Sequence, residues 1–411
     1  MSLKALAMFS SNLRILLLLS LAPSLQAGEL TFFEALRLAQ DLTPELRADE
    51  GRKRGESLRL EAERVSTYLP NLNIQRSQSS RSFGEQEQFS LNGNVNLFKF
   101  GGDSAKLRQS SLEEKKIEES RRDFLLQLEG SLARKFLKWI SQSLSFQHKK
   151  KLRALTEERG KLTKARYERG LISFMELERA ESDLLQDEIN LEKESFDLES
   201  AKIDIRSLLG ENSLQAEWPW SRQSLADQLL KLSSIPLKNH PRLLKLQYER
   251  SSKGEEMTVI KSAAAPSLSS SWSLPLNSKL NEGEIRISLD VPISPWASLR
   301  PRQESVLADQ QSLEDSYRVE EKNLRETLDK SVLKLKQGLL ILDRSKLLYE
   351  KIKALYTQNL QRFEKGMLSS EGLYQDELRL RAAEGTLLQV LYDLQLVMVE
   401  LSETSGLRLL P

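Results

Sequence analysis

Four short stretches of the sequence alternate apolar and polar residues with a period of two, which is the pattern of β-strands with one apolar face. The clearest is residues 88–98, where Phe89, Leu91, Val95 and Leu97 alternate with Ser90, Asn92, Asn94 and Asn96. Residues 267–276 and 283–293 repeat the alternation, and residues 71–81 show it more weakly. Each stretch is about ten residues long, which suits a tilted strand crossing a bilayer. A soluble sheet of four amphipathic strands is the alternative.

Between these stretches the apolar residues recur every three to five positions, as in helices that pack as coiled coils. Residues 103–169 contain no proline, and as one helix they would be ~100 Å long at 1.5 Å per residue. Two shorter predicted helices, 44–68 and 173–209, together nearly match that length. Further helices are predicted as follows: 31–41, 241–265, about 302–365 and 369–405.

The sequence carries an internal duplication. Residues 166–173 (RYERGLIS) match residues 362–369 (RFEKGMLS) at an offset of 196, and the same offset carries Pro70 onto Pro266. An ordinary helix C-terminus explains a basic residue followed by glycine once, but not several matches in one register. The sequence therefore predicts two repeats with the same internal order, 28–210 and 236–411, joined by a linker at 211–235.

Trp218 and Trp220 lie in this linker, on either side of Pro219. We interpret them as packing anchors for the crossover between the repeats. A platform for a ligand is the alternative reading of the same two side chains.

The first residues resemble a secretory signal. Lys4 and Arg14 precede a short apolar run at 15–21, Pro23 follows, and cleavage is expected after Ala27. A run this short favours a cleaved signal (residues 1–27) over a helical anchor. We therefore expect the protein to be exported.

Composition excludes several classes of function. The chain has 411 residues, no cysteine, two histidines and a formal net charge of +2, with a mean hydropathy of −0.45. No basic excess is available to neutralise nucleic-acid phosphates. Disulfides, thiolate metal sites and a lipidated cysteine are impossible without cysteine. No HExxH motif or phosphate loop is present, so we expect no enzyme, no cofactor and no metal site.

Four strands cannot close into a barrel. An open strand edge cannot lie in hydrocarbon, because each unpaired amide and carbonyl would cost several kcal/mol. Membrane barrels begin at about eight strands. If the strands enter a membrane, several chains must therefore share one barrel.

With these features the chain resembles the TolC family of outer-membrane efflux proteins. The most specific element is the hairpin tip, an aromatic residue followed after two positions by glycine, which stands here at Tyr167–Gly170 and again at Phe363–Gly366. The resemblance covers nearly the whole mature chain. It implies an α+β membrane protein, in which a homotrimer builds a twelve-stranded outer-membrane β-barrel and a periplasmic α-barrel of long helical hairpins.

The resemblance also implies a function. Family members are passive exit ducts for efflux or type I secretion, which dock a periplasmic adaptor and an inner-membrane pump and open by an iris-like relaxation of the inner helix pairs. The pump selects the cargo, so drug, metal and protein export all fit. The adaptor-docking residues implied at the tips are Arg166, Tyr167, Gly170, Leu171, Ser173, Arg362, Phe363, Gly366, Met367 and Ser369.

An acidic residue six positions after each tip glycine narrows the entrance in the better-known members. Glu176 has this position in the first repeat, whereas Gly372 has it in the second. Glu371, Asp376 and Glu377 lie nearby, and we expect the first two to line the entrance with Glu176. The alternative function is a periplasmic coiled-coil scaffold or adaptor that never enters lipid.

Overall fold

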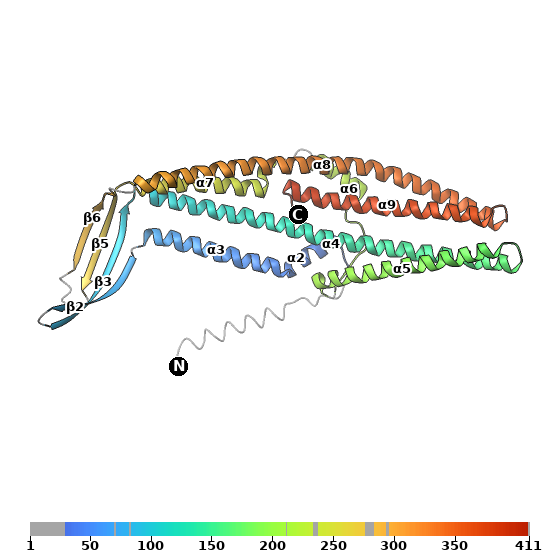
Figure 1. Cartoon of the computed structure of the whole chain (residues 1–411), viewed down its shortest axis with the longest axis horizontal. Coiled ribbons are helices and arrows are strands. Elements are labelled where there is room, and N and C mark those ends of the chain that lie inside the picture. Colours follow the sequence, from blue (N-terminus) through green and yellow to red (C-terminus); the bar gives the residue numbers. More distant parts are fainter. Residues whose placement is uncertain are drawn as a thin grey trace.

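The computed structural model describes residues 29–69, 71–81, 84–210, 212–232, 237–275, 283–292 and 296–409. They form a long molecule with a small sheet at one end and two helical hairpin tips at the other (Figure 1). The predicted signal sequence lies outside the described residues. No described helix is both long enough and apolar enough to cross a membrane.

The two halves of the chain repeat one order of elements: a helix, two strands and a long helical hairpin. The first half contains α3 (Pro44–Tyr68), β2 (Asn71–Arg81), β3 (Gly84–Phe98), α4 (Gly102–Glu168) and α5 (Phe174–Leu209). The second contains α7 (Pro241–Ser262), β5 (Ser267–Pro275), β6 (Glu284–Asp290), α8 (Trp296–Glu364) and α9 (Ser370–Ser405). The short elements β1 (Glu29–Leu30) and α2 (Phe32–Leu42) precede the first half, and β4 (Ser213–Leu214), α6 (Arg222–Leu232) and η1 (Leu237–Asn239) lie between the halves.

The predicted helices and strands are present, with differences at their ends. α3 and β2 have the predicted bounds, and α4 has the predicted 67 residues. The prediction that the second long helix begins near Arg302 is wrong, because α8 begins at Trp296 and contains Pro301 in its second turn. Proline there removes only one backbone hydrogen bond of a 69-residue helix. The sequence also missed α6 and the parallel pairing of β1 with β4.

The long strands form one antiparallel sheet in the order β2-β3-β5-β6. The register places Leu72, Gly93, Trp272 and Ile285 in one row across the sheet. Residues directly opposite each other share a face, so this row belongs to the apolar face. Gly93 is required there, because a Cβ at this position would come within 2.2 Å of the Trp272 ring. The apolar face is uncovered in the single chain, and Ile285 is 79% exposed.

The other face of the sheet is polar, as predicted. Its members include Asn73, Asn92, Asn94, Ser271, Ser273, Glu284 and Arg286. The predicted alternation fails after Asn96, because a β-bulge shifts the register and Phe98, rather than Leu97, lies opposite Leu268.

The helices form two layers that follow each other along the molecular axis, one beside the sheet and one toward the tips. Beside the sheet the neighbours are α3-α4-α7-α8, and toward the tips they are α8-α9-α4-α5 (Figure 1). α7 packs on both α4 and α8, whereas its counterpart in the first half, α3, packs chiefly on α4. α3 has no buried residue among those described.

The main apolar core lies at mid-length, where the shorter helices end. Phe32 of α2 makes edge-to-face contacts with Phe136 of α4 and with Trp220 of the linker, at centroid distances of 6.1 and 5.6 Å. All three side chains are buried. Trp218 lies against Tyr392 at 6.4 Å. The interpretation of the two tryptophans as packing anchors is therefore confirmed.

The C-terminal residues fold back onto this core. Arg408 Nε donates to the buried carboxylate of Glu129 at 2.6 Å, and the Leu409 N–H donates to its other oxygen at 3.2 Å. Arg408 also reaches Gln40 of α2 at 3.1 Å. These contacts tie the end of the second repeat to the beginning of the first.

His240 caps the N-terminus of α7 at the junction between the repeats. Its Nδ1 accepts from the Arg242 N–H at 3.2 Å, and its Nε2 lies 3.1 Å from the Glu403 carbonyl oxygen, to which it donates. Acceptance at Nδ1 requires the neutral ring, with its proton on Nε2. Burial lowers the pKa of His240 below its ordinary 6.5, and the positive charge of Arg242 acts in the same direction. The hydrogen bond to the Glu403 carbonyl and the charges of Asp123 and Glu320 oppose this shift.

We expect acid to destabilise the protein partly through His240. Below about pH 6.5 the unfolded chain takes up this proton before the folded chain does, so stability falls as the pH falls. His240→Asn keeps a good N-cap without a titrating group. The thermal unfolding midpoint of His240→Asn should fall less between pH 7.5 and 5.5 than that of the wild type. His148→Gln, which leaves the cap intact, serves as the control, and equal pH dependence in His240→Asn and the wild type would refute this role.

Candidate functional site: the hairpin tips and the helices behind them

Both hairpin tips are built on the same backbone turn. Gly170 and Gly366 have φ of +68° and +73°, values that favour glycine. The N–H of the residue after each glycine bonds to the carbonyl five residues earlier, Leu171 to Arg166 at 3.0 Å and Met367 to Arg362 at 2.8 Å. This is a Schellman motif, which ends a helix. The two glycines are thus required as helix C-caps, whatever else the tips bind.

The second helix of each hairpin then starts at a serine. The Ser173 hydroxyl accepts from the Glu176 N–H at 3.3 Å, and the Ser369 hydroxyl accepts from the Gly372 N–H at 3.2 Å. Both serines are N-caps, the preferred role of this residue at a helix start. The primary role of the duplicated motif is therefore structural: it encodes a tight turn between two helices.

The tips expose apolar side chains. Leu171 and Met367 have equivalent positions in the two repeats, and they are 67% and 70% exposed. Phe174 and Met175 extend this apolar surface on the first tip, and sequence reasoning missed them. Tyr167 is partly exposed, with its ring 6.2 Å from that of Phe174.

The tips of the two hairpins also touch. The Arg166 guanidinium lies over the Phe363 ring, 4.0 Å from its centroid. Phe363 is buried, whereas Arg362 beside it is exposed. In this chain Arg166 and Phe363 thus hold the hairpins together, and Leu171 and Met367 face outward.

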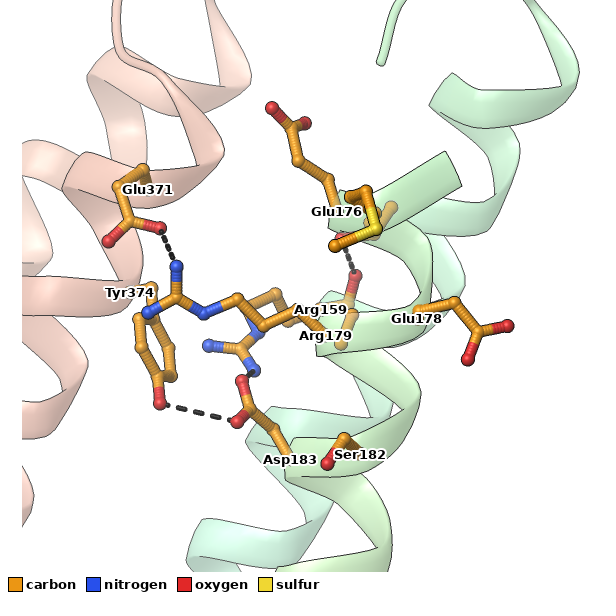
Figure 2. Close-up of a pocket in the computed structure, with 11 residues that line it drawn as sticks. Arg159, Glu176, Glu178, Arg179, Ser182, Asp183, Glu371 and Tyr374 are labelled. Carbon is orange, nitrogen blue, oxygen red and sulfur yellow. Dashed lines mark hydrogen bonds and ion pairs between the residues drawn. The ribbon is translucent and has the colours of Figure 1, made fainter. Parts of the chain in front are cut away.

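The expected entrance residues divide into two groups. Glu176 and Glu371 are exposed and border one cavity of about 600 Å³ between the hairpins (Figure 2). Glu371 is paired with Arg179 of the first hairpin at 3.3 Å. Asp376 lies apart from this cavity lining and accepts from the Asn359 amide at 2.6 Å, within the second hairpin.

Arg159 of α4 forms the centre of the cavity wall. It donates to Asp183 of α5 at 2.8 Å, and its guanidinium lies 4.2 Å from the ring centroid of Tyr374 of α9. The Tyr374 hydroxyl donates to the other oxygen of Asp183 at 3.3 Å, as Figure 2 shows. Burial raises the pKa of Tyr374, and the negative charge of Asp183 adds to that shift. This tyrosine therefore stays neutral and acts as a donor.

A second group of ion pairs lies one turn further from the tips. Arg381 of α9 donates to Asp187 of α5 at 2.8 Å and also binds Glu377 one turn away on its own helix. Glu377 is only 2% exposed, and Arg159 approaches it at 3.6 Å. Glu377 is thus a buried, paired carboxylate rather than an open entrance residue. We name the set Arg159, Asp183, Asp187, Tyr374, Glu377 and Arg381 the inter-hairpin network.

These contacts connect the two hairpins to each other. The network joins α4 and α5 to α9 by ion pairs and hydrogen bonds among buried and half-buried side chains. Within the described part of the chain, no cluster of three metal-ligating side chains occurs. Sequence reasoning missed Arg159 and Arg381, whose partners lie in other helices.

We expect Arg381→Ala to loosen the hairpins. The substitution leaves Asp187 and Glu377 without their shared cation, and breaking a buried ion pair in this way costs about 3 kcal/mol. Backbone hydrogen exchange in residues 180–190 and 374–384 should accelerate, with little change near the sheet. Lys161→Ala, which breaks an exposed pair with Glu157, is the control and should change exchange little. Unchanged exchange in Arg381→Ala would show that the network does not hold the hairpins.

No family model matches the sequence, and no curated protein matches it. Solved structures do match. The outer membrane protein VceC from Vibrio cholerae has a TM-score of 0.78 at 13% identity, over 92% of this chain and 96% of that chain. CusC, a protein that forms a transmembrane channel, has a TM-score of 0.78 at 16% identity, over 93% and 96%. The open-state MtrE outer membrane channel of Neisseria gonorrhoeae has a TM-score of 0.74 at 14% identity, over 92% and 89%. The chain therefore has the fold of the TolC-family outer-membrane efflux channels.

Proposed function

We propose that this chain is one subunit of a trimeric outer-membrane exit duct, a passive channel-tunnel for efflux or type I secretion. The observation that carries the proposal is that every layer of the molecule ends at the same two open edges. β2, α3 and α5 form one edge, and β6 and α8 form the other. Such unlike edges meet head to tail, and repeated head-to-tail contacts generate a ring when the rotation closes, as we propose here for three chains.

The two edges carry matching apolar rows. Beyond its first turn, α5 exposes the apolar residues Leu185, Ile189, Phe196 and Ile203. The half of α8 nearer the tips exposes Leu333, Leu340, Ile341, Leu347, Leu348 and Leu355. Both rows follow the seven-residue spacing of a coiled-coil seam. Neither row is covered in the single chain, so each needs a partner helix, and we assign α5 of one subunit to α8 of the next.

The same closure completes a barrel in the outer membrane. Three chains supply twelve strands, with the apolar face toward lipid and the polar face toward an aqueous lumen, as membrane barrels require. The 67- and 69-residue helices α4 and α8 then continue the wall for ~100 Å into the periplasm. Export by a cleaved signal sequence, residues 1–27, fits this location. No nucleic acid and no cofactor enters the proposal.

The hairpin tips are the proposed docking site for a periplasmic adaptor, which in turn binds an inner-membrane pump. The support is the exposed apolar surface of Leu171 and Met367, which repeats in both hairpins at the end farthest from the sheet. Arg166, Tyr167, Arg362 and Phe363 fix the shape of this surface, and Glu176 and Glu371 border the entrance beside it. Opening moves α8 and α9 away from α4 and α5, against the inter-hairpin network.

Assembly is tested by the protein mass of the detergent-extracted complex from the outer-membrane fraction, corrected for bound detergent. We expect three chains per particle. Phe196→Ser combined with Leu340→Ser should shift the complex toward monomers, because it removes apolar contact from both edges, whereas Phe196→Leu should leave it trimeric. A monomer recovered in the salt-soluble periplasm would contradict the duct and leave the periplasmic scaffold as the explanation.

Docking is tested with a purified periplasmic adaptor from the same organism and the intact trimer. Leu171→Asp together with Met367→Asp should weaken binding at least about tenfold, because buried apolar anchors at an interface are each worth more than about 1 kcal/mol. Ser207→Asp adds one carboxylate at the other end of α5, away from the tips, and should leave binding unchanged. Equal binding by both variants would move the docking site away from the tips.

A further inference from the structure

The sheet and the helices meet at a junction that carries a duplicated basic pattern. An offset of 194 residues relates the starts of the two long helices, Gly102 of α4 and Trp296 of α8. The same offset carries Lys106 onto Arg300 and Arg108 onto Arg302. Each long helix therefore has two cations, at its fifth and seventh residues, within ~10 Å of its start along the axis.

Most of these cations have no acidic partner among the described residues. Arg108 is paired with Glu255 at 2.9 Å. Lys106, Arg300 and Arg302 are exposed and form no ion pair within the described residues, and neither does Lys261 at the end of α7. Asp103 and Glu304 are the other acidic side chains in these turns, so cations are in excess.

The helix ends at this junction are close together. A Cβ on Gly102 would come within 2.2 Å of the Ser262 hydroxyl, so the start of α4 lies against the end of α7. A cavity of about 710 Å³ lies between the end of α7 and the first turns of α8. Its walls are Ala264, Ala265 and Leu299 on the apolar side and Lys261, Arg300 and Gln303 on the polar side.

Aromatic residues indicate the level of the membrane surface. The exposed rings of Phe98 and Phe100 stack edge to face with centroids 4.9 Å apart, directly before α4. Phe100 has a φ of +39°, an unusual value for a residue other than glycine. Exposed aromatic side chains at the end of membrane strands lie at the lipid–water interface. The unpaired cations therefore lie one to two helical turns beyond that interface.

We propose that this junction binds anionic phospholipid of the periplasmic leaflet, with Lys106, Lys261, Arg300 and Arg302 on the headgroup phosphates and the cavity between α7 and α8 taking one lipid. The inference rests on the proposed insertion of the sheet in the outer membrane. The charge complementarity selects the partner, because cations at a membrane surface attract anionic lipid within a Debye length. Phosphate and a single negative headgroup charge are the features recognised.

The test uses the intact complex reconstituted in phosphatidylcholine vesicles with a trace of spin-labelled lipid. The motionally restricted part of the spin-label spectrum reports lipid in contact with protein. We expect spin-labelled phosphatidylglycerol to be preferred severalfold over spin-labelled phosphatidylcholine. Lys106→Gln, Arg300→Gln and Arg302→Gln combined should lower the preference at least about threefold, since each cation near the surface accounts for up to about fivefold.

A matched control carries three neutralised cations elsewhere on the same helices. Lys138→Gln, Lys336→Gln and Lys351→Gln affect exposed cations far along α4 and α8, without an ion pair among the described residues. The control should keep the wild-type preference, and 0.5 M salt should abolish the preference in both. Equal loss in the control, or full preference in the junction variant, would overturn the proposal.

The same spectra separate this proposal from the proposed function. Restricted lipid of both kinds in equal amounts would show an inserted protein without headgroup selection, which overturns the lipid site alone. No restricted lipid of either kind would show that the sheet does not enter the bilayer, which overturns the duct as well.

Discussion

The structure depends on edges that the chain cannot satisfy by itself. In the described part of the chain, the outer edges of β2 and β6 have no neighbouring strand, and the apolar face of the sheet is exposed. In water the uncovered face is unfavourable, and in lipid the unpaired backbone groups are worse. Closure with further copies is the arrangement that removes both costs. The helical layers end at the same two edges, so in the proposed ring one rotation would close every layer at once.

The position of the mid-length core follows from the lengths of the helices. α4 and α8 run from the sheet to the tips without interruption, whereas α3 with α5, and α7 with α9, cover that length in two pieces. Where two short helices meet end to end, the backbone groups and side chains at their ends need other residues to pack against. Phe32, Trp220 and the C-terminal Arg408 lie at this level, so the interrupted helices are joined through an apolar core and a buried carboxylate, Glu129. The local need at the break explains why the linker and both ends of the described chain converge there.

The features that could be predicted from the sequence are those encoded by hydrophobic periodicity and by the internal duplication. A period of two gave the sheet, a proline-free run gave the length of α4, and the duplication gave the order of elements in the second half. Prediction from the sequence failed where the outcome depends on contacts between distant residues. The bulge before Phe98 changes no residue type, so alternation cannot reveal it. Arg159 and Arg381 look like ordinary helix-surface cations until α9 is laid against α4 and α5.

The site residues show the same difference between local patterns, which can be predicted, and contacts between distant residues, which cannot. The tip glycines and serines were found because their local roles, a left-handed C-cap and an N-cap, leave a signature in seven residues. Phe363 carries the same signature as Tyr167, yet it is buried under Arg166 while Tyr167 stays partly exposed. Duplicated sequence positions therefore need not be equivalent, because the same residue type meets different neighbours in the two hairpins of the folded chain.

Different interactions hold the molecule at its middle and at its tips. The middle is apolar, with Phe136, Leu335 and Leu394 fully buried, and such contacts grow stronger with the area they cover. Near the tips the hairpins are joined instead by ion pairs, which add little net stability because desolvation offsets their attraction. Ion pairs do, however, fix which side chains meet. In the proposed duct, which must stay assembled while its end opens, this division would place the large, non-directional energy where nothing moves. It leaves at the tips a specific contact that water can replace at small cost.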